Sequence, residues 1–223
     1  MVNIMISRLY KLYLHRRIMR NRDSIPGHIT LVLSESGLLT SDGYKSLQST
    51  VDICRELGIQ MISIYVDILD TENRLKQEVA CRLIADLERM VSRLSYSPKL
   101  KIYSLDGELY KEVDGSVPEI FFSAGFGGRD EITKAVRSIL GDVEKGRVKV
   151  EEIDENILES RLMLQNEPDV VIRAGGRNLS DFLIWQSVYS ELFFTDINWS
   201  DIRDIDVLRI IRDYQMRQRR FGR

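Results

Sequence analysis

The sequence predicts an α/β fold in a single domain, with a central, mostly parallel six-stranded sheet flanked by helices. Short runs rich in β-branched residues alternate along the whole chain with longer amphipathic segments, the pattern typical of a parallel sheet covered on both faces. Of the 223 residues, 43% are hydrophobic, which is enough for a full core. There is no internal repeat, and only four prolines are available to mark linkers.

The expected elements follow from hydrophobic periodicity. Six runs predict strands: ITLVL (29–33), MISIYV (61–66), KIYSL (101–105), EIFFSA (119–124), DVVIR (169–173) and ELFF (191–194). Amphipathic segments predict helices over 44–57, 71–94, 129–141 and 151–164. Within the single domain of residues 1–223 we also expect a basic leading helix in 1–25 and a C-terminal helix with a tail in 200–223.

Charge is distributed unevenly although the net charge is only −2. That balance gives no reason to expect a nucleic-acid partner. The first 25 residues and the last 12 are strongly basic, whereas residues 151–160 are acidic. Leucine, isoleucine and tyrosine alternate with arginine in the first segment, a composition that suits peripheral contact with an anionic membrane. Docking of this helix on its own domain is an equally open interpretation.

Cysteine usage and hydropathy indicate the compartment. Cys54 and Cys81 are in no metal-ligand spacing, so we expect buried, reduced thiols. No apolar run approaches the roughly 20 residues of a membrane span, and the N-terminus lacks the features of a signal peptide. The expectation is a cytoplasmic protein, with or without peripheral membrane contact.

The segments that follow the predicted strands predict an anion site. Ligands of open α/β sheets bind at the carboxyl ends of the strands, where this chain places Ser34–Gly37, Asp67, Gly125–Arg129 and Arg173–Ser180. Glycines let backbone N–H groups approach an anion, and the arginine that ends DVVIR adds a cation. An ordinary ion pair between Arg173 and a nearby acid is the alternative.

The block PDVVIRAGGRNLSDFLIWQSVYSELFFTDINW (168–199) and the ending RQRRFGR resemble the C-terminal half of the cis-prenyltransferases, the undecaprenyl and dehydrodolichyl diphosphate synthases. GFGGRDEI (125–132), IPGHITLVL and LYKLYLHRRI resemble upstream segments of the same family. These enzymes extend an allylic diphosphate with isopentenyl diphosphate. The resemblance therefore implies their fold over nearly the whole chain.

The same resemblance implies roles for individual residues. Arg173 corresponds to the family's first diphosphate-binding arginine, and Ser180 to a serine that also contacts isopentenyl diphosphate. Glu191 corresponds to a glutamate that helps to bind magnesium. Arg220 and Gly222 fit the C-terminal R-x-G, which reaches into the neighbouring subunit's active site. A guanidinium fork, a hydroxyl and a carboxylate suit those tasks.

Two departures set this chain apart from the catalytic members. Ser34 occupies the position of the family's metal-binding aspartate, and of the phosphate loop D-G-N-G-R-W only Gly37 remains. The stretch that follows is shortened, and so is the family's G-G-E-x-R-x-S. The second arginine of that motif is thereby lost or displaced, and Arg177 is its candidate replacement.

Loss of the aspartate loop implies a non-catalytic subunit of a heteromeric cis-prenyltransferase, inactive alone and similar to the Nogo-B receptor type, in a prokaryotic, archaeal version. Its partners would be a catalytic subunit, in a heterodimer or heterotetramer, and isopentenyl diphosphate. Its C-terminal tail would complete the partner's active site, where Mg²⁺ would be bound. The product would be a long polyprenyl diphosphate, precursor of a dolichol-like glycan carrier.

Two other functions remain open. In a self-sufficient homodimeric synthase, Glu35 or Asp67 would replace the missing metal ligand. In a fold-retaining interaction scaffold there would be no prenyl chemistry at all. His28, before the first strand, is interpreted as structural, and Glu191 could equally be a solvated carboxylate.

Overall fold

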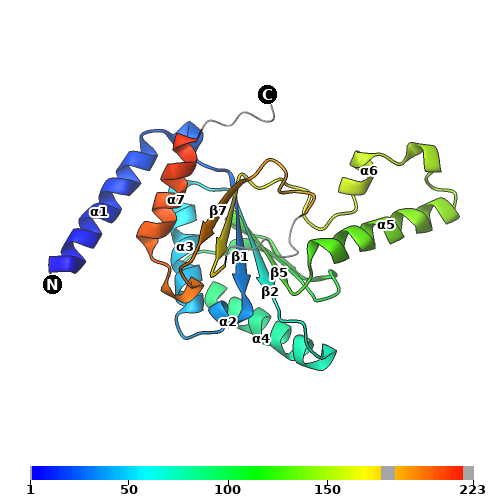
Figure 1. Cartoon of the computed structure of the whole chain (residues 1–223), viewed down its shortest axis with the longest axis horizontal. Helices are drawn as coiled ribbons and strands as arrows, with labels where there is room; N and C mark the ends of the chain where they lie inside the picture. Colours follow the sequence, from blue (N-terminus) through cyan, green and yellow to red (C-terminus); the bar gives the residue numbers. More distant parts are fainter. Residues whose placement is uncertain (1, 177–183, 218–223) are drawn as a thin grey trace.

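One seven-stranded sheet forms the centre of the protein (Figure 1). The computed structural model describes residues 2–176 and 184–217, and for residues 2–5 only the backbone. The strands are β1 (His28–Ser34), β2 (Met61–Asp67), β3 (Pro98–Tyr103), β4 (Leu109–Val113), β5 (Ser116–Ala124), β6 (Val170–Ala174) and β7 (Glu191–Thr195). Their order is β4-β3-β5-β2-β1-β6-β7, and only the β3–β4 pair is antiparallel.

Helices cover both faces of this sheet. They are α1 (Val2–Met19), α2 (Glu35–Leu38), α3 (Gly43–Leu57), α4 (Asn73–Val91), α5 (Gly128–Glu144), α6 (Glu155–Glu159) and α7 (Asp204–Met216). Short 3₁₀ turns occupy Arg22–Ser24, Val150–Glu152 and Trp199–Asp201. In Figure 1, α1, α3 and α7 lie to one side of the sheet and α5 and α6 to the other. The prediction of an α/β fold with flanking helices is confirmed.

The core is divided by the sheet because successive side chains of a strand point to opposite faces. Ile29, Leu31 and Leu33 of β1 belong to the larger hydrophobic cluster, together with buried side chains of α1, α3, α4 and α7. Val32 belongs to the smaller cluster on the other face, with Tyr65 of β2. Apolar residues on both faces of β1 explain why its sequence is a continuous apolar run rather than an alternating one.

The sequence-based prediction of six strands was wrong by one. The additional strand, β4, has only exposed residues and pairs with the edge strand β3. A strand whose two faces are both in water produces no run of buried residues, and so the hydrophobic pattern did not reveal it. The predicted strand 101–105 is displaced to Pro98–Tyr103, because the chain turns at Ser104 into the hairpin that leads to β4.

The predictions of a helix over 151–164 and of a buried thiol at Cys81 were also wrong. Only α6 forms in that segment, since Asp154 has extended backbone and caps α6 by accepting a hydrogen bond from the Ile157 amide at 2.9 Å. After Ser160 the chain leaves the helix and carries the backbone amide of Met163 to Glu131. Cys54 is buried as expected, whereas Cys81 is exposed on α4.

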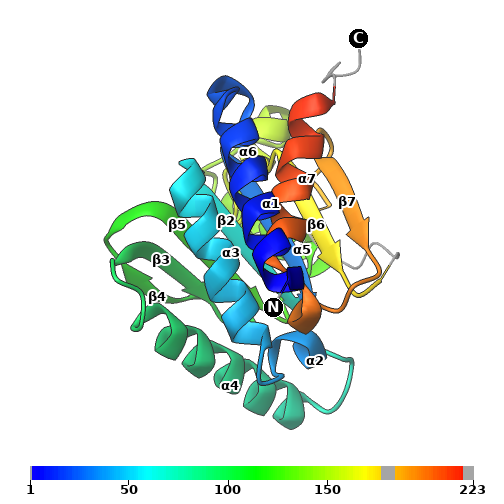
Figure 2. The same ribbon diagram turned by 90° about the vertical axis from the view of Figure 1, so that its left-hand side faces the viewer.

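Helix α1 docks on its own domain, as one of the two interpretations of the sequence expected. Leu14 and Ile18 are fully buried against the core, and α1 lies beside α7 (Figure 2). None of the helices in the described part of the chain is long and apolar enough to cross a membrane.

Candidate functional site

The carboxyl edge of the sheet has the geometry of a ligand site. The chain fills one side of β1 with β2, β5 and β3, then returns to place β6 on its other side. This reversal of strand order next to β1 is where open α/β sheets form their binding crevice. Ser34 ends β1 there, Asp67 ends β2, and Arg173 is the penultimate residue of β6.

Arg173 and Asp67 meet across the end of β1. In the register of the sheet, Arg173 lies opposite Val32, and Asp67 lies opposite Ser34. All four side chains therefore project from the same face. The Arg173 Nη1 donates a hydrogen bond of 2.6 Å to Asp67 Oδ2, and the two side chains are 15% and 33% exposed. The ion-pair alternative for Arg173 is thus observed, with Asp67 as the acid.

Ser34 acts as a helix cap. Its Oγ accepts a hydrogen bond of 3.1 Å from the Gly37 amide and one of 3.2 Å from the Ser36 hydroxyl, which starts the short helix α2. A serine oxygen at an N-cap satisfies an amide that the helix itself leaves free. The residue that the resemblance aligns with the family's aspartate therefore has a local structural task.

The connection after β1 is closed and tightly packed. Leu38 is fully buried, and Trp199, which is 2% exposed, donates from Nε1 to the Gly43 carbonyl at 3.0 Å. A Cβ at Gly43 would lie 2.3 Å from the Leu38 carbonyl oxygen, and one at Gly37 would lie 3.3 Å from the Trp199 Cβ. Both glycines thus permit close packing. In the family as the resemblance describes it, this segment wraps phosphates.

Two buried polar atoms beside the end of β1, Nε of Arg173 and Oε2 of Glu35, have no hydrogen-bond partner among the described residues. The hydroxyl of Ser123, the penultimate residue of β5, is also buried and without such a partner. Buried polar atoms are nearly always paired in native proteins, and an unpaired one in a crevice indicates a place for a ligand atom, water or ion. A donor and a carboxylate acceptor are left open close to the end of β1.

The turn after β6 has backbone that a ligand can approach. Gly175 has a φ of +74°, which glycine adopts without strain. Its amide donates to the carbonyls of Thr195 and Ile197, each at 3.1 Å. Among the described residues other than its chain neighbours, the atom nearest to a Cβ at Gly176 would be Arg173 Nε, 4.0 Å away.

A cavity of about 390 Å³ adjoins the Asp67 side of this edge. It lies between the ends of β2 and β5 and includes Asp67, Asp70, Arg129 and Asp130 among its lining residues. Lys76 donates to Asp70 at 2.5 Å and holds the pKa of that carboxyl below its usual value. Since Asp67 is paired with Arg173 and Asp70 with Lys76, two of its three carboxylates already have a cation as partner.

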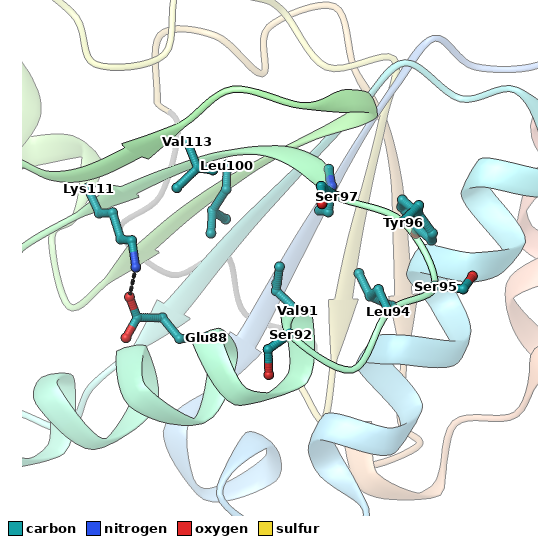
Figure 3. A pocket seen from close by; sticks show the side chains of 11 residues that line it. Glu88, Val91, Ser92, Leu94, Ser95, Tyr96, Ser97, Leu100, Lys111 and Val113 are labelled. Carbon is teal, nitrogen blue, oxygen red and sulfur yellow. Dashed lines mark hydrogen bonds and ion pairs between the residues drawn. The ribbon is translucent and has the colours of Figure 1, made fainter.

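A second cavity, of about 380 Å³, lies at the start of β3 (Figure 3). It is bounded by the C-terminal end of α4 and by the β3–β4 hairpin. Its charged side chains, Glu88 and Lys111, already pair with each other at 2.6 Å. None of the residues predicted to bind a ligand lines it.

Glu191 lies at the amino edge of the sheet, where the parallel strands begin. It begins β7, and Arg173 pairs with Phe194, three residues farther along that strand. At about 3.3 Å per residue, the two candidate residues are separated by roughly 10 Å along the strand direction. The Glu191 Oε2 accepts a hydrogen bond of 2.5 Å from Arg217 Nη1, and the Arg217 guanidinium stacks 4.1 Å from the centroid of the Phe193 ring. The structure does not bring Glu191 and Arg173 into one site.

Four predicted site residues, Arg177, Ser180, Arg220 and Gly222, lie outside the residues that the structure describes.

The described residues do not form a site for the magnesium ion that cis-prenyltransferases generally use. In residues 2–176 and 184–217 no three His, Cys, Asp or Glu side chains are grouped so that they could hold a metal ion. Asp67 is engaged by Arg173, and Glu191 by Arg217 at the other edge. The hard oxygen ligands that Mg²⁺ requires are thus not gathered among these described residues.

His28 has a structural role, in agreement with the interpretation of the sequence. Its ring contacts Ser63 Oγ at 2.8 Å and the Glu167 carbonyl at 3.2 Å. Burial lowers its pKa from 6.5 to about 4, so the ring is neutral at physiological pH. It lies at the amino end of β1, away from the crevice.

A buried polar cluster at the start of α5 was not predicted. Glu131 Oε1 accepts hydrogen bonds from the amides of Met163 (2.8 Å) and Leu164 (3.4 Å), and the Gln186 side chain donates to both of its carboxylate oxygens. Burial raises the pKa of Glu131. The cluster ties α5 to the segments before β6 and before β7. In the sequence its only sign was an acid within GFGGRDEI.

Comparisons with known proteins identify the family of this chain. Residues 108–222 match the family model described as putative undecaprenyl diphosphate synthase. Over 203 residues the chain is 37% identical to the tritrans,polycis-undecaprenyl-diphosphate synthase (geranylgeranyl-diphosphate specific) of Pyrococcus horikoshii, covering 81% of this chain and 76% of that protein. The chain belongs to the cis-prenyltransferase family. The family prediction from the sequence is therefore confirmed.

Other relatives match nearly end to end. Isoprenyl transferase 1 of Corynebacterium efficiens is 31% identical, with 96% of this chain and 97% of the relative covered. The Methanopyrus kandleri synthase is 30% identical over 258 positions, covering all of this 223-residue cis-prenyltransferase homologue and 94% of the relative. An alignment with more positions than the chain has residues leaves positions of that relative unmatched. This agrees with the shortening inferred from the sequence.

Solved structures confirm the fold. Lavandulyl diphosphate synthase of Lavandula x intermedia, solved with dimethylallyl diphosphate, superposes with a TM-score of 0.75 at 22% identity, covering 90% of this chain and 100% of that one. A probable undecaprenyl diphosphate synthase of Campylobacter jejuni gives 0.67 at 22% identity. The curated relatives are named as a synthase and as an isoprenyl transferase, which favours the self-sufficient enzyme over the predicted accessory subunit.

Proposed function

We propose that this chain is the non-catalytic subunit of a cis-prenyltransferase and leaves the metal-dependent chemistry to a catalytic partner. The observation that carries the proposal is the connection after β1. There Ser34 caps α2, and the segment that follows is closed by Leu38, Gly43 and Trp199. A loop packed in this way has no room to wrap a diphosphate.

The chemistry explains why this connection matters. When isopentenyl diphosphate attacks an allylic diphosphate, negative charge develops on the departing diphosphate, and a metal ion with its ligands stabilises that charge. Ser34 offers a neutral hydroxyl where a carboxylate would be needed. Asp67, the acid that faces it in the sheet, is neutralised by Arg173 at 2.6 Å.

The chain would contribute binding rather than catalysis. Arg173 has a donor, Nε, still unpaired among the described residues and could hold one diphosphate oxygen beside Gly176. The tail, through Arg220 and Gly222, would reach isopentenyl diphosphate and Mg²⁺ in the partner's site. The complex would be a heterodimer or heterotetramer, and its product a long polyprenyl diphosphate for a dolichol-like carrier.

A self-sufficient synthase is the second candidate, and two observations favour it. The curated relatives are named as synthases in their own right. In addition, Glu35 begins α2 directly after β1, and its buried Oε2 has no partner among the described residues. A carboxylate oxygen left open in a crevice is a suitable ligand for a hard cation. Glu35 would then take the place of the missing aspartate.

Incorporation of labelled isopentenyl diphosphate into long-chain product separates the candidates. It would be measured with Mg²⁺ and either farnesyl or geranylgeranyl diphosphate. The samples are this chain alone, the catalytic relative from the same genome alone, and both together. Product only in the mixture supports the accessory subunit. Turnover by this chain alone that disappears in Glu35→Gln establishes the self-sufficient enzyme.

Variants refine the outcome. Arg220→Ala is expected to lower activity of the mixture by about 100-fold, the scale of one lost charge contact in a transition state. The neighbouring Arg219→Ala, which removes the same charge outside the R-x-G, should leave activity within about twofold, since a solvated charge contributes little. No product from any combination, together with a stable complex between the two chains, would instead indicate a scaffold.

A further inference from the structure

Helix α1 has an inner face that fixes it to the domain. Leu14 and Ile18 of this face are fully buried. Lys11 pairs with Asp204 of α7 at 2.5 Å, and the Gln215 side chain donates to the Ile18 carbonyl at 3.2 Å. These contacts hold α1 beside α7. They thereby also fix the direction in which the outer face of α1 points.

The outer face of α1 is apolar and exposed. Ile6, Leu9, Leu12 and Tyr13 are each more than half exposed, and Leu9 reaches 61%. Residues at i, i+3, i+6 and i+7 lie on one side of a helix, so the four side chains form one continuous stripe. Figure 2 shows α1 at the front of the molecule, with no other element drawn over it. We call these four residues the α1 stripe.

Cations without acids accompany the α1 stripe. Residues 1–22 contain five arginines and one lysine and no aspartate or glutamate. Arg16 follows the stripe on the same side of the helix, because it lies three residues after Tyr13, and Arg20 lies in the turn directly after the end of α1. Neither forms an ion pair with any described carboxylate. An apolar stripe continued by unpaired cations is complementary to the boundary between anionic headgroups and acyl chains.

A second exposed apolar surface, on α5, differs from the α1 stripe in the charge of the residues around it. Val136 and Leu140 of α5 border a groove of about 410 Å³ together with Trp185, and its charged lining residues are Asp154 and Glu155. Helices α5 and α6, which carry residues of this groove, lie on the other side of the molecule from α1 (Figure 1). Its exposed leucine resembles those of the α1 stripe, but its acids would be repelled by an anionic bilayer.

We propose that the α1 stripe is a membrane-docking surface that places the protein on anionic lipid bilayers. The apolar side chains would enter the headgroup boundary while Arg16 and Arg20 contact lipid phosphates. Each cation close to an anionic surface raises binding about fivefold, so the two arginines together account for roughly 25-fold. The proposal depends on α1 alone and not on whether the chain is catalytic.

Sedimentation of the full chain with vesicles tests this proposal. Vesicles of phosphatidylcholine are compared with vesicles containing about 30% phosphatidylglycerol, a fraction in the range of anionic leaflets. We expect at least about tenfold tighter binding to the anionic vesicles, which weakens at high salt. Arg16→Gln with Arg20→Gln should remove this preference, and Leu9→Ser with Leu12→Ser should weaken binding to both kinds of vesicle.

Leu140→Ser is the matched control, since Leu140 is 53% exposed on the acid-lined groove of α5. It should bind vesicles as the unchanged protein does. The side chains substituted in and just after α1 (Leu9, Leu12, Arg16 and Arg20) are all exposed, so we expect each variant to fold. Thermal unfolding at the same temperature as the unchanged protein confirms it. Binding that is absent, or equal for all variants, overturns the proposal. Concentration-dependent self-association that disappears with Leu9→Ser would overturn it as well and assign the stripe to a second copy.

Discussion

The two edges of the sheet use polar residues in different ways. At the amino edge, Asp169 accepts hydrogen bonds from the amides of Gly27 (2.8 Å) and His28 (3.1 Å) and from the Tyr214 hydroxyl at 3.3 Å. The His28 ring is likewise paired through both nitrogens. At the carboxyl edge, buried atoms of Arg173 and Glu35 have no partner among the described residues. Polar groups at the first edge maintain the fold, whereas some at the second have no partner among the residues that the structure describes.

The two ion pairs sharpen this contrast. The Arg173–Asp67 pair lies at the carboxyl edge with only 15% of the arginine side chain exposed. The Glu191–Arg217 pair at the amino edge is equally short, 2.5 Å, but 43% of its arginine is in water. The same distance therefore represents different energies, because water screens the second pair and is largely excluded from the first. The predictions below test that difference, beginning with the largest expected effect.

Asp67→Ala should lower the free energy of unfolding by about 3–4 kcal/mol, because it leaves the mostly buried Arg173 without a counter-charge. The value lies in the lower part of the range for buried pairs, since Asp67 is one-third exposed. Urea unfolding measures it. The double variant Asp67→Leu with Arg173→Met should lose much less than the sum of the single changes. A loss under about 0.5 kcal/mol for Asp67→Ala would mean that water already solvates the arginine.

His28 should make the amino edge sensitive to acid. Above pH 6.5 the ring is neutral in both states and contributes nothing to pH dependence. Below pH 6.5 the unfolded chain takes up a proton that the folded protein accepts only near pH 4. The free energy of unfolding therefore falls as the pH falls from 6.5 to about 4, by at most about 3 kcal/mol.

His28→Gln is the control for this pH dependence. Unfolding by urea at several pH values should show a flatter profile between pH 6.5 and 4 for the variant than for the unchanged protein. Burial raises the pKa of Glu131, which acts with the opposite sign, since the folded state then gains the proton first. The difference between the two profiles cancels the Glu131 contribution. Identical profiles would contradict the buried, neutral state of His28.

Glu131 offers a graded test of a buried, satisfied carboxylate. Glu131→Ala should lower the free energy of unfolding by about 2–3 kcal/mol, because it leaves the amide of Met163 without an acceptor and leaves the Gln186 side chain with only the Leu164 carbonyl as acceptor. Glu131→Gln should cost under about 1 kcal/mol, since an amide oxygen can accept the same hydrogen bonds without a buried charge. Thermal or urea unfolding at pH 7 measures both. Equal losses for the two variants would show that volume, and not hydrogen bonding, decides the effect.

Arg217→Ala should have the smallest effect, about 0.5 kcal/mol or less, because its pair with Glu191 is partly in water. The difference from the unchanged protein should shrink further at 1 M salt, where the Debye length is about 3 Å. Urea unfolding at low and high salt provides the measurement. A salt-independent loss above about 2 kcal/mol would place this pair in the same class as Arg173–Asp67 and remove the contrast between the edges.

Several features of the site were predictable because they depend on local pattern. The strand that ends at Arg173 and the glycines after it appear directly in the sequence, and so does the serine at the family's aspartate position. Family similarity then indicated which of these residues to examine. The buried Glu131 cluster was not predictable, since its partners lie 32 and 55 residues away along the chain. Nothing in local composition distinguishes such an acid from a solvated one.

The same division applies to the fold. Continuous apolar runs revealed the buried central strands, because burial on both faces leaves its record in residue type. The exposed strand β4 and the truncated helix at 151–164 left no such record. β4 depends on backbone pairing with β3, and α6 is limited by the cap at Asp154. Hydrophobic periodicity indicates which residues are buried. It indicates a strand or helix only where the hydrogen-bonded segment also buries one of its faces.

The sequence by itself determined the α/β class and the cis-prenyltransferase family, and through the resemblance it led us to expect that Ser34 replaces the family's aspartate. Only the tertiary structure decided that Asp67 pairs with Arg173, that Glu191 lies at the opposite edge, and that α1 docks inward while its stripe faces outward. Residue identity limits which interactions a side chain can make. Which of them it makes depends on strand order and register, since these bring together residues such as Asp67 and Arg173, 106 positions apart in the chain.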